Sequence, residues 1–112
     1  MTGPVSIVVT LHVKPECEVE FLALLMPLLD AMRQEESFLD CALHRDPEDP
    51  TLLMLYENWA DLDELAAVQM KRPYRAAYEA RLPALLRTPR HARLWRPVRR
   101  DAARIDRAAA ES

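Results

Sequence analysis

The sequence predicts a single α+β domain with the element order β-α-β-β-α-β, in which a four-stranded antiparallel sheet carries its helices on one face. Three observations support this class. First, several stretches either alternate between apolar and polar residues or are continuously apolar, as β-strands are. Second, two long stripes of apolar residues repeat at helical spacing. Third, an acidic turn with two prolines separates two consecutive predicted strands. At 112 residues, half of them hydrophobic, the chain is long enough for one core.

The first predicted strand covers residues 5–14, where apolar residues occupy every second position. Pro15 breaks this strand and begins a helix, and acidic residues in the first turn favour a helix N-terminus. The apolar stripe of this helix comprises Phe21, Leu24, Leu25, Leu28, Leu29 and Met32. We expect Pro27 to kink the helix, because proline has no amide hydrogen to donate to the preceding turn.

Residues 38–45 and 52–59 are predicted to form a hairpin around the proline-containing turn. The second of these strands is apolar at every position from 52 to 56, which indicates cover on both faces. Glu57 and Trp59 then fall on one face, because strand side chains alternate. A carboxylate beside an indole could form a pocket wall. In the alternative, Trp59 belongs to the core and Glu57 pairs with an arginine.

The second helical region begins at Leu62, after Asp61, which can cap it together with Glu64. Residues 71–73 break this helix, and a second helical run to Leu86 follows, with Pro83 favouring a kink or an early end. Residues 90–98 predict a short edge strand, since they are rich in arginine and contain a proline. This places a domain at residues 1–98 and a tail at 99–112, which is rich in Ala and Arg and is either a loose helix or disordered.

This order is the split βαβ, or ferredoxin-like, pattern. Its helices cover one face of the sheet, yet the strands at 5–13 and 52–59 are apolar on both sides. An apolar sheet face left open marks an interface. We therefore expect a homodimer that buries sheet against sheet.

Composition excludes several classes of function. Gly3 is the only glycine, which excludes a glycine-rich phosphate loop. Cys17 and Cys41 have no metal-binding spacing, and the absence of a signal peptide or long apolar span favours a reduced, cytoplasmic protein without a membrane segment. Residues 1–70 hold 3 basic against 14 acidic side chains, and residues 71–112 hold 12 against 4. This asymmetry favours self-association or an anionic ligand. Because the C-terminal arginines lack interleaved glycines or aromatics apart from Trp95, and the N-terminal part is acidic, we expect no nucleic-acid binding.

With these elements in place, residues 5–98 resemble the antibiotic biosynthesis monooxygenase (ABM) domain family of dimeric, ferredoxin-like α/β-barrel proteins. The resemblance rests on Val13-Lys-Pro-Glu16 before the long helix, Arg33-Gln-Glu-Glu-Ser-Phe-Leu39 at its end, and Leu55-Tyr-Glu-Asn-Trp59 followed by residues 61–67. It implies a homodimer with a pocket between sheet and helices. Family members include quinol and aromatic-polyketide monooxygenases that use O2 without metal or flavin, so it also implies no cofactor.

The sequence departs from the family pattern at three positions. Gln69 stands where the family often has a histidine, Tyr74 where a second histidine commonly follows proline, and Ser37 where glycine is usual. Distant haem-degrading relatives need the first histidine as an iron ligand, and glutamine does not replace imidazole. They also use an asparagine on the first strand, which is absent here. The resemblance therefore argues against haem degradation.

The resemblance also suggests which residues form the site. The candidate catalytic residues are Trp59, Tyr74 and Gln69, the candidate substrate-binding residues are Tyr56, Tyr78, Arg75 and His12, and no metal ligand is expected. Trp59 could stack on an aromatic substrate, while Tyr74 or Gln69 could donate hydrogen bonds to its ring oxygens. Arg75 could favour a phenolate. Alternatively, the tyrosines pack helix against sheet and His12 is an ordinary residue at the strand end.

The leading hypothesis is a cofactor-independent monooxygenase acting on a small aromatic, quinol or polyketide-like substrate. A second hypothesis is a non-oxidative enzyme or small-molecule binding protein on the same dimeric scaffold, which the missing histidines support. A third is a structural dimerisation module. An open apolar pocket with convergent polar groups favours either of the first two over the third.

Overall fold

The computed structural model describes residues 2–104. The strands are β1 (Val5–His12), β2 (Phe38–Arg45), β3 (Leu52–Trp59) and β4 (His91–Trp95), and the α-helices are α1 (Glu18–Met32), α2 (Leu62–Ala67) and α3 (Ala76–Leu85). Short 3-10 helices lie at η1 (Pro15–Cys17), η2 (Gln69–Lys71) and η3 (Pro73–Arg75). The predicted element order is confirmed, with the second helical region broken near residue 72.

The four strands form one antiparallel sheet in the order β2-β3-β1-β4. The central pair β1–β3 runs in register from Val5 opposite Trp59 to His12 opposite Leu52. This is the strand order of the split βαβ pattern, so the predicted ferredoxin-like class is confirmed. Because directly opposed residues share a face, the register separates the side chains of each strand into two sets.

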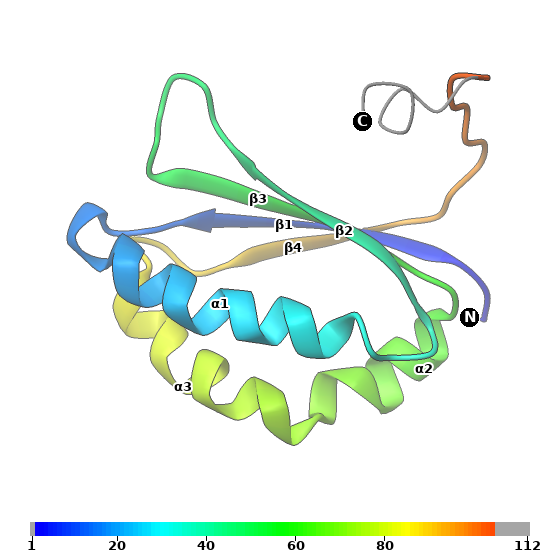
Figure 1. Cartoon of the computed structure of the whole chain (residues 1–112), viewed down its shortest axis with the longest axis horizontal. Helices are drawn as coiled ribbons and strands as arrows, with labels where there is room; N and C mark the ends of the chain where they lie inside the picture. Colours follow the sequence, from blue (N-terminus) through cyan, green and yellow to red (C-terminus); the bar gives the residue numbers. More distant parts are fainter. Residues whose placement is uncertain (1, 105–112) are drawn as a thin grey trace.

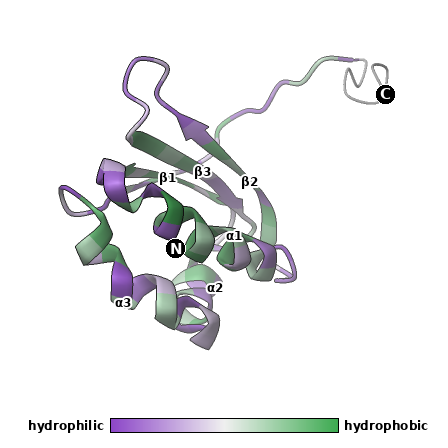
Figure 2. Ribbon diagram, turned by 60° about the vertical axis from the view of Figure 1, so that its left-hand side comes forward, coloured by the Kyte–Doolittle hydropathy of each residue, from purple (hydrophilic) through white to green (hydrophobic). Residues whose placement is uncertain are grey.

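All three helices lie on one side of the sheet, as Figures 1 and 2 show. The core fills the space between them. Its largest fully buried side chains come from β1, β3, α1 and α3, and they include Trp59, Phe21, Leu11, Leu25, Met32, Leu53 and Leu85. The other face of the sheet carries no helix and is called the open face below.

Local signals explain where the helices begin and end. The Asp61 carboxylate accepts a hydrogen bond from the Glu64 amide at 3.1 Å, as expected for a cap of α2. Helix α1 continues through Pro27, and α3 ends two residues after Pro83. Arg72, which precedes Pro73, has extended backbone angles (φ −62°, ψ 134°), because a following proline disfavours the helical conformation. This extended residue separates η2 from η3.

The C-terminal segment leaves the sheet after the short edge strand β4. Residues 96–104 are exposed and form no regular element, and in Figure 1 this segment runs to the side of the sheet away from the helices. Residues 105–112 of the predicted tail lie outside the described residues, so the division at residue 98 stays a prediction. Within residues 2–104, no helix has the length and apolarity to cross a membrane. The cytoplasmic location also stays a prediction.

Candidate functional site

A cavity of about 260 Å³ lies between the covered face of the sheet and the three helices. Most of its wall is apolar and comes from β1, β3, β4, α1, α2 and η2: Ile7, Val9, Leu25, Leu28, Leu29, Met32, Leu55, Leu62, Leu65, Ala66, Met70, Ala92 and Leu94. Four side chains with polar groups complete it, namely Glu57, Arg75, Tyr78 and Arg90. An apolar hollow with a few convergent polar groups is typical of a small-molecule site.

Glu57 places a carboxylate in this wall from the covered face of β3, where strand alternation puts it among core residues. It is only 7% exposed, and its Oε1 accepts a hydrogen bond from Trp59 Nε1 at 3.0 Å. Burial raises the pKa of Glu57 above its ordinary value, while the indole hydrogen bond and the Arg75 and Arg90 charges oppose this rise. Glu57 is therefore a carboxylate that accepts protons more readily than an exposed one.

Arg75 brings a positive charge to the cavity from the end of η3 and is 7% exposed. Its Nε donates a hydrogen bond to the backbone carbonyl of Gln69 at 3.0 Å. Within residues 2–104, its two terminal nitrogens form no hydrogen bond or ion pair. The side chain is thus held by its Nε, and its terminal N–H donors are uncommitted.

Tyr78 on α3 contributes a hydroxyl that is buried and has no hydrogen-bond partner among the described residues. Burial raises the pKa of Tyr78 to about 12, and the nearby Arg90 charge opposes this rise. Arg90, just before β4, is itself held by Glu79 through two hydrogen bonds of 2.9 Å. A buried hydroxyl without a partner costs stability, so its retention needs an explanation.

A polar network lies behind the cavity and joins the end of α1 to η2 and η3. The buried Gln69 amide donates to Glu35 Oε2 at 2.9 Å and to Glu64 Oε1 at 2.7 Å. Glu35 also accepts from Tyr74 at 3.1 Å and from Arg72 at 3.1 Å. The Gln69 hydrogen bond is the largest of several contacts that lower the pKa of Glu35. Because the Gln69 carbonyl holds Arg75, this network fixes the arginine in the cavity wall.

The structure separates the predicted site residues into several groups. Tyr78 and Arg75 line the cavity, whereas Gln69 and Tyr74 belong to the polar network. Trp59 is fully buried beside Glu57, and its ring packs edge-on against Phe38 with 5.3 Å between ring centroids.

Two predicted residues lie away from the cavity. Tyr56 is on the open face and is 40% exposed. His12 lies at the end of β1, where its Nε2 is 3.0 Å from Thr51 Oγ1 and 3.3 Å from an Asp49 carboxylate oxygen. The structure therefore does not bring the seven predicted residues together.

Of the four polar cavity residues, Glu57 and Arg90 were not among the candidate catalytic or binding residues. Strand alternation places Glu57 beside Trp59 on one face, and this was the sequence signal for a possible pocket wall, because a carboxylate on a core-facing position is unusual. Arg90 carries no comparable local signal, since its place depends on its ion pair with Glu79 of α3.

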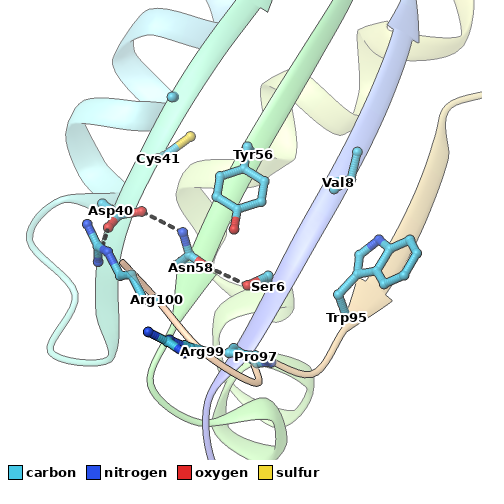
Figure 3. Close-up of a pocket in the computed structure, with 11 residues that line it drawn as sticks. Ser6, Val8, Asp40, Cys41, Tyr56, Asn58, Trp95, Pro97, Arg99 and Arg100 are labelled. Atoms are coloured by element: carbon cyan, nitrogen blue, oxygen red, sulfur yellow. Dashed lines mark hydrogen bonds and ion pairs between the residues drawn. The ribbon is translucent and has the colours of Figure 1, made fainter. Parts of the chain in front are cut away.

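The open face has a hollow of its own, of about 600 Å³ (Figure 3). Across its floor the polar side chains satisfy one another: Asn58 donates to Asp40 at 2.7 Å, and Ser6 donates to Asn58 at 2.5 Å. Tyr56 and Trp95 stand beside this ladder, as Figure 3 shows, and both are partly exposed. Within residues 2–104, no group of three or more His, Cys, Asp or Glu side chains could hold a metal ion.

The fold and the cavity define a small ferredoxin-like domain with a ligand-sized space between sheet and helices. A family model described as "Antibiotic biosynthesis monooxygenase" matches residues 4–80, and the chain belongs to this family. The family resemblance of the sequence is thereby confirmed.

Individual proteins agree with this assignment. A relative from Pestalotiopsis microspora named a "putative monooxygenase" is 34% identical over 95 residues, which cover 84% of this chain and 79% of the relative. Among solved structures, Rv0793 from Mycobacterium tuberculosis superposes with a TM-score of 0.80 at 20% identity, covering 88% of this chain and 99% of that one. A variant of SnoaB from Streptomyces nogalater, described as a cofactor-independent oxygenase, has a TM-score of 0.76 at 16% identity, covering 88% and 96%. At these identities the two structures establish the fold.

Proposed function

We propose that this protein is a cofactor-independent monooxygenase for a small hydroxyaromatic or quinol-type compound, bound in the cavity between sheet and helices. The observation that carries the proposal is the cavity itself, an apolar space into which Glu57, Arg75 and Tyr78 bring unused hydrogen-bonding groups. A filled core would leave no such space, so the cavity disfavours a purely structural dimerisation module.

The chemistry is feasible without a cofactor when the substrate is itself electron-rich. Loss of a hydroxyl proton gives an aryloxide, which can transfer electrons to O2. For a phenol with a free ring carbon, one atom of O2 becomes a new quinone carbonyl and the other leaves as water, so the substrate supplies all the electrons. The protein's part is to hold the ring, take the proton and stabilise the anion.

The relatives support this proposal. The chain belongs to a family described by its monooxygenases, and the curated relative carries the same description. SnoaB, which shares the fold, is described as a cofactor-independent oxygenase. The apolar wall suits an aromatic ring, and the polar groups suit its oxygens.

Oxygen consumption with a panel of naphthols, hydroquinones and anthrones tests the proposal. We expect at least one compound to give saturable uptake with an oxygenated product and no release of hydrogen peroxide. Ala92→Phe, which fills the cavity from an exposed position on the edge strand β4, should abolish uptake. The matched control Ala80→Phe on an exposed position of α3 should not. Saturable binding without uptake would favour the alternative, a non-oxidative binding protein or enzyme on this scaffold.

We further infer that two copies pair through the open face. The helices cover only one face, and Val8, Met54, Tyr56 and Trp95 leave apolar surface on the other. Light scattering should give a dimer at micromolar concentration. Val8→Asp should give monomers or insoluble protein, because it places a charge in the centre of the interface, while Ala80→Asp on the far side of the helices should stay dimeric. A monomeric wild-type protein would contradict this inference.

A further inference from the structure

Three buried side chains present uncommitted polar atoms to the same cavity. Within residues 2–104, the Tyr78 hydroxyl has no hydrogen-bond partner, although the Arg90 charge lies near it. The terminal nitrogens of Arg75 form no hydrogen bond to a described residue, and Glu57 uses Oε1 for Trp59 while no described group bonds to its Oε2. Each of these residues is at least nine-tenths buried. The Tyr78 hydroxyl is the atom of this set that is itself buried without a partner, and such groups are normally satisfied. Because the uncommitted atoms of Arg75 and Glu57 belong to the same cavity wall, the three side chains are placed to bind one ligand.

We propose that Glu57 takes the hydroxyl proton of a neutral hydroxyaromatic ligand, and that Arg75 and the Tyr78 hydroxyl hold the resulting aryloxide. In this step the O–H bond of the ligand breaks and its electron pair stays on the ligand oxygen. The proton forms a new O–H bond on the Glu57 carboxylate. The assignment rests on the proposed use of the cavity, but it concerns proton transfer and needs no oxygen.

Charge balance favours this division of roles. Glu57 is the one carboxylate among the residues that line the cavity, and Arg75 is a cation beside it, whereas the charge of Arg90 is paired with Glu79. Proton transfer moves the negative charge from Glu57 to the ligand oxygen, so the total charge of the site does not change. An apolar site of this kind accommodates such a shift far better than the entry of a new charge.

Geometry supports Glu57 as the proton acceptor. The indole N–H of Trp59 fixes one carboxylate oxygen at 3.0 Å, which orients the other. Burial raises the pKa of this carboxyl, and that brings its basicity closer to the basicity of a phenolate. The charged or titratable groups that act on Glu57 are Arg75 and Arg90 in the cavity, Tyr78 from α3 and Cys41 from β2.

The same arrangement defines the class of ligand. A ligand that carries a permanent carboxylate would meet Glu57 as a like charge, so a neutral phenol or hydroquinone is preferred over an aryl carboxylate. A cavity of about 150 Å³ can hold benzene, and this one is about 260 Å³. One substituted ring or two fused rings therefore fit.

The test is an anaerobic titration with 4-nitrophenol, whose phenol and phenolate forms differ in colour. If Glu57 accepts the proton, the wild-type complex absorbs as the phenolate below the probe's own pKa, yet its formation releases no proton to the solvent. Above that pKa the affinity falls about tenfold per pH unit, because the complex needs one proton. The E57Q variant keeps an oxygen for the Trp59 hydrogen bond but has no acceptor. It should release one proton for each phenolate bound, and its affinity should not fall with pH.

Two further variants test the anion-holding groups. Arg75→Met should give a complex that absorbs as the neutral phenol. Tyr78→Phe should weaken binding roughly fivefold, the scale of one lost hydrogen bond, while its melting temperature stays equal or rises because a buried hydroxyl without a partner is removed. A tyrosine that only packs would leave binding unchanged. Glu16→Gln, on an exposed position of η1, is the matched control and should behave as wild type.

The outcomes separate this inference from the proposed oxygenation. One outcome is that the wild-type protein consumes oxygen while its affinity for 4-nitrophenol is constant or rises with pH. That result would overturn the proposed role of Glu57, whereas the proposed oxygenase function would stand. The expected proton pattern without oxygen uptake on any substrate would support Glu57 and overturn the oxygenase. Absence of saturable 4-nitrophenol binding would overturn the inference as well.

Discussion

The two faces of the sheet are built from alternate residues of the same strands, yet they use their polar groups in opposite ways. On the covered face, the Tyr78 hydroxyl, the terminal nitrogens of Arg75 and one Glu57 oxygen have no hydrogen-bond partner within residues 2–104. On the open face, Asp40, Asn58 and Ser6 bond to one another across three strands. The covered face therefore offers the groups that the proposed ligand would satisfy.

This difference has a simple physical basis. A buried polar atom without a partner costs about 1–3 kcal/mol, so the retention of the Tyr78 hydroxyl in the cavity wall favours a ligand that satisfies it. The self-satisfied ladder on the open face can be buried against another surface at little cost, as a dimer interface requires. This difference agrees with our proposals that the ligand binds on the covered face and that a partner copy packs on the open face.

The largest expected effect is on the free energy of unfolding, for a core residue of the covered face compared with a residue of the open face. Trp59→Ala should lower the free energy of unfolding by about 3–5 kcal/mol, because a fully buried indole is lost from a packed core. Tyr56→Ala, three positions away and 40% exposed, should cost less than about 1 kcal/mol in monomeric protein. Urea unfolding measures both. Equal losses would mean that the two faces are not packed differently.

A smaller effect is expected in the polar network behind the cavity. Gln69→Ala removes the amide shared by Glu35 and Glu64, and should cost about 1–3 kcal/mol in urea unfolding. It should also weaken ligand binding, because the network holds the segment that carries Arg75. Wild-type stability with wild-type binding would show that the network has no positioning role. The conservative control is Lys71→Ala, an exposed side chain in the same segment.

Much of this fold could be predicted from sequence because its signals are local. The predicted strands at residues 38–45 and 52–59 agree with β2 and β3. The proline-containing turn marks where β2 ends, and the apolar run after it marks where β3 begins. The break at residues 71–73 follows from a proline. The same alternation that pairs Glu57 with Trp59 also places Tyr56 on the other face.

The site was harder to predict because it depends on contacts distant in sequence. Gln69 meets Glu35 from 34 positions away, and Arg90 is held beside the cavity by Glu79 of α3. No periodicity in the sequence specifies such a contact. Trp59 lies against Glu57, which is itself in the wall, and a contact between Trp59 and a ligand stays a prediction.

The buried carboxyl on the covered face should make a pH-dependent contribution to stability. Burial raises the pKa of Glu57, so its ionised form destabilises the native state. That cost is absent below the unfolded-state pKa and develops as pH rises through the raised native pKa. E57Q should therefore be more stable than wild type at pH 8 and indistinguishable from it near pH 4, as measured by thermal unfolding. A variant less stable at pH 8 would contradict this sign.

The smallest effect is expected at the C-terminus, beside the open face. Truncation after Arg99 removes the exposed contact between Arg100 and Asp40, 3.6 Å apart, and exposed ion pairs contribute little. The melting temperature should stay nearly unchanged. A large drop at concentrations where the protein is dimeric would mean that the tail packs across the interface.

The central claim, that the ligand lies on the covered face, is tested most directly by NMR of methionine methyl groups. Met32 and Met70 line the cavity, whereas Met54 lies on the open face. With ¹³C-methyl methionine and an anaerobic titration of 4-nitrophenol, the signals of Met32 and Met70 should move together and saturate, while the Met54 signal stays in place. Movement of Met54 alone would place the ligand on the open face and contradict the account.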